Sequence, residues 1–234
     1  MKVLMLSSSS YADYDYLAYA QDWIQQHLEN ISEVVFVPFA GVTIDWDEYT
    51  QKVQDALPFI KVIGLHSCDS PSTRLQNAQA ILVGGGNTFN LLHQLYLQEL
   101  LPIIKQKIAS GTPYIGWSAG SNICGLSIRT TNDMPIIEPK SFDALAVLNA
   151  QLNPHYTDQH MEGFHGETRD QRLLEFSTLW PEIPVIGIRE GSALLLENNQ
   201  LRLLGTQKAV LFHGAQKKVI EQDHDLAGFL NNAK

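Results

Sequence analysis

The segment 112-TPYIGWSAGSN-122 joins a short apolar run to a serine that lies between two glycines. The run 112–117 predicts a buried strand, and the small residues after it predict a sharp turn into a helix. A second apolar run, 78-AQAILVGGG-86, ends in three glycines and is separated from the first by a helical pattern. Two buried strands joined by a helix favour parallel pairing in a sheet that is covered on both faces.

The rest of the chain extends this pattern. Apolar runs at 2–8, 33–40 and 61–67 predict further strands, and helical periodicity appears at 15–28, 45–57 and 87–110, the last broken near Pro102. After a helix at 168–180 and a strand at 184–190, we expect a hairpin at 192–205 that turns at Asn198-Asn199, and antiparallel edge strands from 208–214 and 217–222. No linker interrupts the sequence. We therefore predict one α/β domain over residues 1–234, with a mostly parallel central sheet, helices on both faces and antiparallel strands towards the C-terminus.

The composition restricts the function. The chain has 44% hydrophobic and 18% charged residues, which suits a globular domain with a sizeable core. A formal net charge of −9 argues against general nucleic-acid binding. No apolar run approaches the ~20 residues of a membrane span, and the first ten residues lack the features of a signal peptide. Cys68 and Cys124 are too few for a disulfide framework, so we expect two buried or half-buried thiols in a reducing compartment.

The pentapeptide 116-GWSAG-120 fits the G-x-S-x-G pattern of a nucleophile elbow. A serine in a sharp turn between strand and helix is exposed at the end of the sheet, and the helix N-terminus directs free N–H groups at the reacting oxygen. Ser118 is then the candidate nucleophile, and Ala119 would supply one oxyanion donor. The alternative is that Ser118 only caps the following helix.

The glycines of 83-VGGGN-87 end the preceding strand, next to the predicted turn at Ser118. Glycine-rich backbone at this place can aim N–H groups at a developing oxyanion, which makes Gly85 and Gly86 further candidates. A dinucleotide-binding fingerprint is the competing interpretation, but Phe89 stands where its last glycine should be.

A serine nucleophile needs a base and an orienting acid. His155 in 151-QLNPHY-156 follows a predicted strand end and a proline-stiffened turn, which is a suitable place for an aimed side chain. Asp133 in "RTTNDMPI" and Glu190 in "PVIGIRE" are both candidates for the acid, and both could equally be solvated loop acids. His155, His160 and His165 are spaced by five residues, so they would not share a helical face, and we predict no metal site.

Eight segments together resemble the peptidase E family of cytoplasmic α-aspartyl dipeptidases: "FVPFAGVTIDWDEYT", "VGGGNTFNLL", "YIGWSAGSN", "IRTTNDMPI", "FDAL", "NPHY", "GETRDQR" and "IREG". They occur in order and span most of the chain. The chain departs from the family pattern at Arg189, where near relatives often have proline, at "SSYADYDY" and at the tail "DHDLAGFLNNAK".

The resemblance implies a serine peptidase of flavodoxin-like or class I glutamine amidotransferase-like fold that hydrolyses dipeptides with an N-terminal aspartate, without metal or cofactor. It matches Ser118 to the nucleophile and His155 to the base, and it leaves Asp133 and Glu190 both open as the acid. Gly85, Gly86 and Ala119 match the oxyanion region, and Asn87 and Arg169 match positions that hold the substrate aspartate. Without the resemblance, Arg169 would be interpreted as a surface residue paired with Glu167 or Asp170. We further expect a cytoplasmic monomer or homodimer with a small aspartyl dipeptide as its substrate, and neither nucleic acid nor membrane as a partner.

Three other functions stay open from the sequence. An α/β-hydrolase esterase also uses G-x-S-x-G, but its histidine comes near the end of the chain, whereas several predicted strands follow His155. A cyanophycinase would use the same serine turn on an aspartate-rich polymer. A catalytically inactive module could bind aspartyl peptides or amino acids without turning them over.

Overall fold

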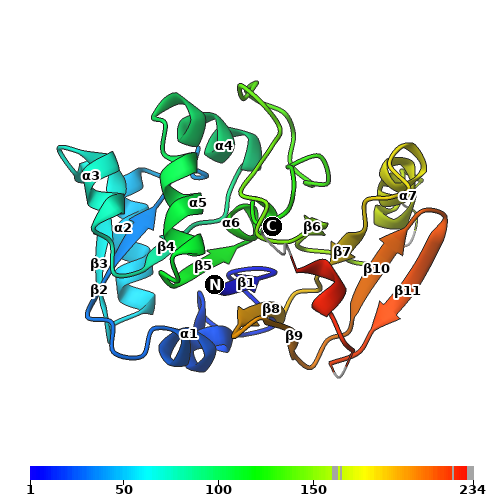
Figure 1. Ribbon diagram of the computed structural model, residues 1–234, viewed down its shortest axis with the longest axis horizontal. Coiled ribbons are helices and arrows are strands. Elements are labelled where there is room, and N and C mark those ends of the chain that lie inside the picture. The colour runs from blue at the N-terminus through cyan, green and yellow to red at the C-terminus, as the bar shows by residue number, and fades with distance from the viewer. Residues whose placement is uncertain (160–162, 164, 223, 231–234) are drawn as a thin grey trace.

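The computed structural model describes residues 1–159, 163, 165–222 and 224–230, and it contains a seven-stranded and a four-stranded sheet with helices around them (Figure 1). The large sheet has the order β3-β2-β4-β5-β1-β8-β9. The first five strands of this order are parallel, β8 is antiparallel to β1, and β9 is antiparallel to β8. The predicted α/β fold with a mostly parallel sheet is therefore confirmed. Its strands are β1 (Lys2–Leu6), β2 (Glu33–Val37), β3 (Lys61–Gly64), β4 (Ile81–Val83), β5 (Tyr114–Trp117), β8 (Ser192–Glu197) and β9 (Gln200–Gly205).

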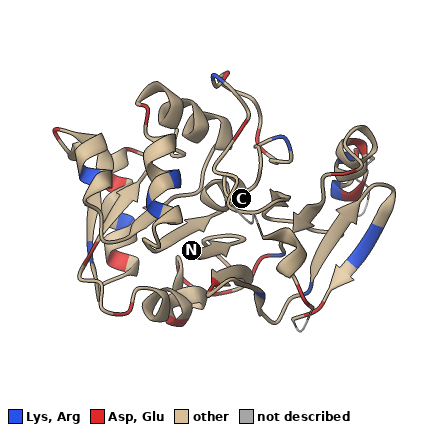
Figure 2. Ribbon diagram, viewed as in Figure 1, with Lys and Arg blue, Asp and Glu red and all other residues tan. Residues whose placement is uncertain are grey.

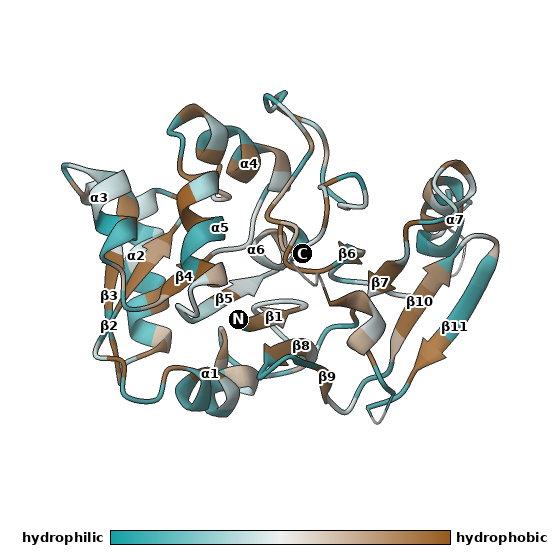
Figure 3. Cartoon of the chain, in the orientation of Figure 1, coloured by the Kyte–Doolittle hydropathy of each residue, from teal (hydrophilic) through white to brown (hydrophobic). Residues whose placement is uncertain are grey.

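Helices cover both faces of the large sheet because successive side chains of each buried strand point to opposite faces. One core holds Ile24 of α1 and Val53 of α2, and the other holds residues of α3, α4 and α5. Figure 3 shows β1, β4 and β8 of the large sheet coloured as largely hydrophobic, with hydrophilic residues on the helices around the sheet. The helices are α1 (Gln21–His27), α2 (Trp46–Ala56), α3 (Pro71–Gln76), α4 (Thr88–Leu97), α5 (Leu101–Ala109), α6 (Ala119–Asn122) and α7 (Arg169–Leu179), with short 3-10 turns at Ala18–Ala20, Leu65–Ser67 and Ala227–Phe229.

The second sheet lies at the other end of the molecule in Figure 1 and has the order β11-β10-β7-β6. The expected strands at 208–214 and 217–222 are present and antiparallel, but they do not extend the large sheet. β10 is also not an edge strand, because it pairs with β7 on one side and β11 on the other. The strands of this sheet are β6 (Gln151–Asn153), β7 (Val185–Gly187), β10 (Ala209–His213) and β11 (Gln216–Ile220).

Some predicted boundaries were wrong for local reasons. The helix expected over 15–28 begins only at Gln21, because Leu17 adopts a left-handed backbone conformation with φ 60°. The break expected near Pro102 lies just before it, and Pro102 occupies the first turn of α5, where its missing N–H costs nothing. The hairpin turns at Asn198-Asn199 as predicted, with φ of 52° and 58° at these two residues.

The structure also bears on the predictions made from composition, which concern membrane spans, charge and the two cysteines. Each helix in the described part of the chain is too short or too polar to span a lipid bilayer. Figure 2 shows charges of both signs on α7 and a basic stretch on β11. Cys124 is buried, Cys68 is half-buried, and both are free, as predicted.

Candidate active site

Ser118 lies between β5 and α6 with φ 52° and ψ −112°, a conformation that a non-glycine residue adopts only under strain. The chain can turn this sharply because the two flanking glycines approach other backbone closely. A Cβ at Gly116 would lie 2.3 Å from the Gly120 carbonyl oxygen, and a Cβ at Gly120 would lie 2.1 Å from the Val83 carbonyl oxygen. Gly120 is thus required by packing of the turn against β4, and Gly116 is required by the close approach of the turn to its own strand, β5.

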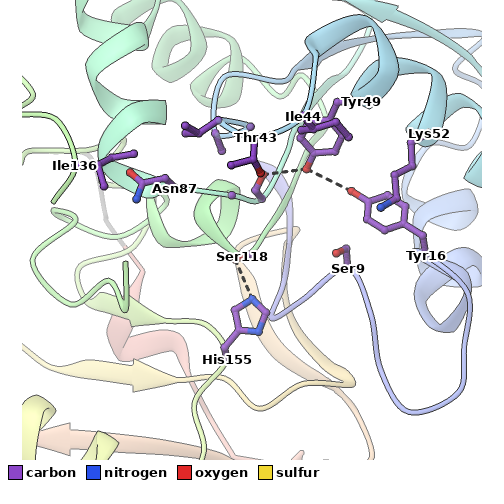
Figure 4. A pocket seen from close by; sticks show the side chains of 15 residues that line it. Ser9, Tyr16, Thr43, Ile44, Tyr49, Lys52, Asn87, Ser118, Ile136 and His155 are labelled. Atoms are coloured by element: carbon purple, nitrogen blue, oxygen red, sulfur yellow. Dashed lines mark hydrogen bonds between the residues drawn. The ribbon is translucent and has the colours of Figure 1, made fainter. Parts of the chain in front are cut away.

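The side chain of Ser118 does not cap α6. Its Oγ instead lies 2.9 Å from Nε2 of His155, and the two side chains point towards each other in Figure 4. His155 follows β6 and also has a left-handed backbone, with φ 55°. The backbone N–H of His155 donates to Oγ of Ser7 at 2.9 Å, and the Ser7 hydroxyl donates to the Ile188 carbonyl at 2.8 Å. Ser7, at the end of β1, therefore holds the backbone of His155 between the two sheets.

Glu190 follows β7 and completes a hydrogen-bonded line with the other two side chains. Its Oε1 lies 2.6 Å from Nδ1 of His155. Because an ionised carboxylate can only accept, Nδ1 carries the proton and Nε2 is left to accept the Ser118 hydroxyl proton. Glu190 is thus the carboxylate that the fold brings to the imidazole.

Asp133 lies elsewhere in the same region and contacts α4. Its Oδ2 accepts from the N–H of Thr88 at 2.7 Å, from the Thr88 hydroxyl at 2.5 Å and from the Thr131 hydroxyl at 3.1 Å. No hydrogen bond or ion pair joins Asp133 to His155, and both lie in the described part of the chain. The Oδ1 atom of Asp133 likewise has no partner among the described residues.

The three N–H groups expected at the oxyanion site are free of protein partners. Within the described ranges, no hydrogen bond is made by the N–H of Gly85, Gly86 or Ala119. Gly85 lies against the nucleophile, since a Cβ there would be 3.0 Å from Cβ of Ser118. Gly86 has φ 134° and would place a Cβ 2.2 Å from the Ala40 carbonyl oxygen, so no other residue fits.

Asn87 lines the site, but both ends of its amide are engaged. It is the N-cap of α4, where its Oδ1 accepts from the N–H of Asn90 at 3.0 Å, and its Nδ2 donates to the Met134 carbonyl at 2.9 Å. A direct bond to a substrate would have to replace or share these contacts. The substrate-binding role of Asn87 stays a prediction.

Arg169 is the first residue of α7, and it does not form the surface pairs considered above. Glu167 pairs with Arg172 at 3.6 Å, and Asp170 pairs with Lys217 at 2.6 Å. The guanidinium of Arg169 instead donates to Oδ1 of Asn132, and its buried Nε has no partner among the residues that the structure describes. Burial, and then the nearby Arg172, lowers its pKa from the ordinary value. Arg169 is therefore a half-buried cation with unused donor capacity.

Ser118 and His155 separate two recesses. The smaller, of about 160 Å³, is polar and also contains Thr88, Asn132, Asp133 and Arg169. The larger recess, of about 700 Å³, lies on the side of residues 84–87, the glycine loop (Figure 4). Its other lining residues include the apolar side chains of Val42, Ile44 and Ile136, and also one cation, Lys52. A substrate carbonyl at Ser118 would thus have one neighbouring group in a charged recess and the other in a wider, more apolar one.

Comparisons with known proteins identify the family of the chain. The family model described as "Peptidase family S51" matches residues 3–204. The chain belongs to peptidase family S51. A curated "Peptidase E" of Shewanella amazonensis is 48% identical over 98% of this chain and 99% of its own, and that of Shewanella oneidensis is 49% identical over 94% of each. A structure titled as a putative peptidase E protein from Listeria monocytogenes shares the fold, with TM-score 0.68 and 22% identity over 88% of this chain and 98% of its own.

The residues of the candidate site that the sequence interpretation did not single out include Ser7, Asn132 and Tyr49, whose hydroxyl donates to the Gly85 carbonyl. Ser7 could have been found, because it follows a predicted strand and ligand sites gather at the carboxyl ends of parallel strands. Tyr49 lies within a helix and Asn132 within a loop, and neither has a local signal. Of the remaining histidines near His155, His165 is exposed and His160 lies outside the described residues.

Proposed function

We propose that this S51 peptidase is a serine-type dipeptidase that hydrolyses Asp-Xaa dipeptides, an α-aspartyl dipeptidase, through an acyl-enzyme on Ser118. The observation that carries the proposal is the line of hydrogen bonds from Ser118 through His155 to Glu190. Ser118 and His155 line a recess that also contains Arg169. The names of the curated relatives support the same activity.

The reaction begins when His155 takes the hydroxyl proton of Ser118 and the Ser118 oxygen attacks the peptide carbonyl carbon. Glu190 holds the imidazole in the required tautomer and stabilises the imidazolium that forms. His155 then gives its proton to the leaving amine, and the Xaa amino acid departs. A water molecule, deprotonated by His155, then attacks the acyl carbon of the ester. The bond from this carbon to Oγ of Ser118 breaks, His155 returns the proton to Oγ, and free aspartate leaves.

The oxyanion of each tetrahedral intermediate is held by the unpartnered N–H groups of Gly86 and Ala119, with Gly85 beside them. Removing one donor of this kind typically costs ~2.7–4 kcal/mol of transition-state stabilisation. No cofactor is required for any step, because proton transfer and charge stabilisation come from residues of this chain.

Selection of aspartate follows from the charges of the small recess. The guanidinium of Arg169 can bind the substrate β-carboxylate, which offsets the net negative charge of the protein locally. The unpartnered Oδ1 of Asp133 can accept from the substrate α-ammonium group. A cation and an anion in one small recess suit an aspartate that carries a free amino group. The wider recess beyond Ser118 then accepts the second residue.

The proposal is tested with purified protein on Asp-Leu, Ala-Leu and Glu-Leu, with detection of the free amino acid. We expect release of aspartate from Asp-Leu and a loss of at least ~10³-fold in kcat for Ser118→Ala, as for the removal of other catalytic serines. Ser110→Ala, which removes an exposed hydroxyl at the end of α5, is the matched control and should behave as the wild type. Wild-type turnover by Ser118→Ala would refute the acyl-enzyme.

Two further substrates, a p-nitrophenyl ester and the aspartate-rich polymer, and a thermal-stability measurement separate the other functions. An esterase would cleave a p-nitrophenyl ester without dipeptidase activity, a cyanophycinase would cleave the full-length polymer, and a binding module would be stabilised by Asp-Leu without turnover. We also propose a cytoplasmic location, supported by the two free cysteines, and a monomer or homodimer without nucleic-acid or membrane partners.

A further inference from the structure

Four aromatic side chains pack together beneath the nucleophile turn: Tyr16, Phe36, Tyr49 and Trp117. Trp117, the residue before Ser118, stacks on Phe36 with ring centroids 5.7 Å apart, and Tyr49 meets Phe36 edge-on at 5.0 Å. Phe36 and Trp117 are fully buried and Tyr49 is 6% exposed. The rings are therefore held in place by packing, and their polar atoms are directed by it.

The hydroxyl of Tyr49 has three partners. It donates to the Gly85 carbonyl at 3.0 Å, and it accepts from Nε1 of Trp117 at 3.2 Å and from the Tyr16 hydroxyl at 3.3 Å. Figure 4 shows Tyr49 between Tyr16 and the glycine loop, on the opposite side of the recess from His155. Burial raises the pKa of Tyr49, so its hydroxyl stays protonated and remains a donor.

The bond to Gly85 acts on the next N–H along the chain. A carbonyl and the N–H of the following residue belong to one planar trans peptide unit and point in opposite directions. Anchoring the Gly85 oxygen on Tyr49 therefore directs the Gly86 N–H away from Tyr49 and keeps it unpartnered. The glycines cannot supply this restraint themselves, since glycine has the widest conformational freedom of all residues.

We propose that Tyr49 is a positioning residue of the reaction, which orients the Gly85–Gly86 peptide as an oxyanion donor and ties it, through Trp117, to the turn that carries Ser118. This inference rests on the proposed function, because an oxyanion forms only if Ser118 attacks a carbonyl. In this inference Trp117, the first x of the G-x-S-x-G pattern, helps to join the Gly85–Gly86 peptide to the turn that carries Ser118.

The test is Tyr49→Phe, which keeps the ring against Phe36 and removes only the hydroxyl. The donor then loses its anchor but is not deleted, so we expect kcat on Asp-Leu to fall by about 10- to 100-fold, less than for a deleted donor. KM should stay within about threefold of the wild type, because the anchored donor acts on the transition state and not on the bound substrate. Thermal unfolding reports separately the cost of leaving Nε1 of Trp117 without an acceptor.

Two binding measurements distinguish positioning from a structural role. An aspartyl aldehyde forms a hemiacetal when Oγ of Ser118 adds to its carbonyl carbon and the serine proton passes to His155, which leaves the oxyanion on the former carbonyl oxygen. Tyr49→Phe should weaken binding of this aldehyde by the same factor as kcat. Asp-Leu itself, bound to Ser118→Ala with and without Tyr49→Phe, should keep its affinity within about threefold.

Tyr96→Phe is the matched control. Tyr96 lies on α4, and the substitution removes a tyrosine hydroxyl that donates to the Asp143 carbonyl at 2.9 Å. A Tyr49→Phe enzyme with kcat within twofold of the wild type, or one that loses ground-state and aldehyde binding equally, overturns the inference. A silent Tyr49→Phe beside an inactive Ser118→Ala overturns only the inference. An active Ser118→Ala overturns the proposed function and the inference together.

Discussion

Glu190 and Asp133 are two loop carboxylates that differ in what they accept from. Glu190 accepts from the imidazole of His155, whereas Asp133 accepts from the N-terminal end of α4 and from Thr131. Acids in these surroundings have different chemical tasks. The first can stabilise an imidazolium during the reaction, and the second can fix a loop and receive a substrate ammonium group with its remaining oxygen.

Substitution by the matching amide should separate the two acids. Glu190→Gln should lower kcat on Asp-Leu by ~10²–10⁴-fold, because an amide can force the wrong imidazole tautomer. Asp133→Asn should act mainly on KM, since it removes the charge that faces the substrate ammonium. Steady-state kinetics of the two variants check this. A larger kcat loss for Asp133→Asn than for Glu190→Gln would contradict the assignment.

Arg169 makes a second prediction at this scale. Arg169→Ala should lower kcat/KM for Asp-Leu by ~10²-fold or more, because a buried charge-assisted pair with the substrate carboxylate is lost. Activity on Ala-Leu, which has no β-carboxylate, should change by less than about threefold. Arg172→Ala, on the same helix but paired with Glu167, is the matched control. Equal losses on Asp-Leu and Ala-Leu would exclude Arg169 from aspartate recognition.

Among the elements, α1 ends in a histidine that the fold buries. His27 is only 4% exposed, and its Nε2 has no hydrogen-bond partner in the described part of the chain. Burial, and secondarily the charge of Lys2, lowers the pKa of His27 to about 4. In the unfolded chain the same group titrates near its ordinary pKa of about 6.5. The native state therefore binds fewer protons than the unfolded state between these two values.

This difference makes His27 a source of acid sensitivity. The contribution of neutral His27 to the free energy of unfolding is fully present above pH 6.5. As the pH falls towards 4, the free energy of unfolding decreases by as much as about 3 kcal/mol, because the unfolded chain gains a proton that the native chain does not. Between pH 7 and pH 4.5, the free energy of unfolding of His27→Gln should decrease by about 2–3 kcal/mol less than that of the wild type. Urea titrations at the two pH values measure this. Identical losses in variant and wild type would contradict the prediction.

At the scale of the whole molecule, the site lies where the two sheets meet. Ser118 belongs to the large sheet, whereas His155 and Glu190 follow β6 and β7 of the second sheet. The second sheet has its own small core of Tyr156, Leu173, Val185, Val210 and Phe212. Lys217 of β11 adds an ion pair with Asp170 of α7. The proposed activity therefore requires that the smaller second sheet dock on the large sheet, which carries Ser118.

Loosening the second sheet should abolish activity before the large sheet unfolds. Phe212 is 2% exposed, and Phe212→Ala should cost about 3–5 kcal/mol through lost burial and a cavity. Three of the four tryptophans, Trp23, Trp46 and Trp117, pack against the large sheet, and the fourth, Trp180, ends α7, so tryptophan fluorescence reports mainly on the large sheet. We expect the urea midpoint of activity to fall below that of fluorescence. Leu82→Ala in β4 is the control and should shift both midpoints together.

Much of the fold could be predicted because its signals are local. The strands at 33–37, 81–83 and 114–117 are short apolar runs, and α2 begins at an aspartate cap that a local pattern reveals. The second sheet could not be assigned in the same way. Its strands are short and pair across long sequence separations, so nothing near 209–213 indicates that β7 is the neighbour of β10. Periodicity predicts a strand and not its partner.

The sequence by itself determined the nucleophile motif and the parallel sheet that presents it, because a strand, a strained turn and its two glycines are adjacent in the chain. Only the tertiary structure decided which acid faces His155, since Glu190 lies 35 residues away from it and Asp133 lies nearer in sequence. The same holds for Arg169, which turns from its helix neighbours to Asn132. Covalent neighbours specify local backbone, whereas the partners of a charged side chain are chosen by packing between distant segments.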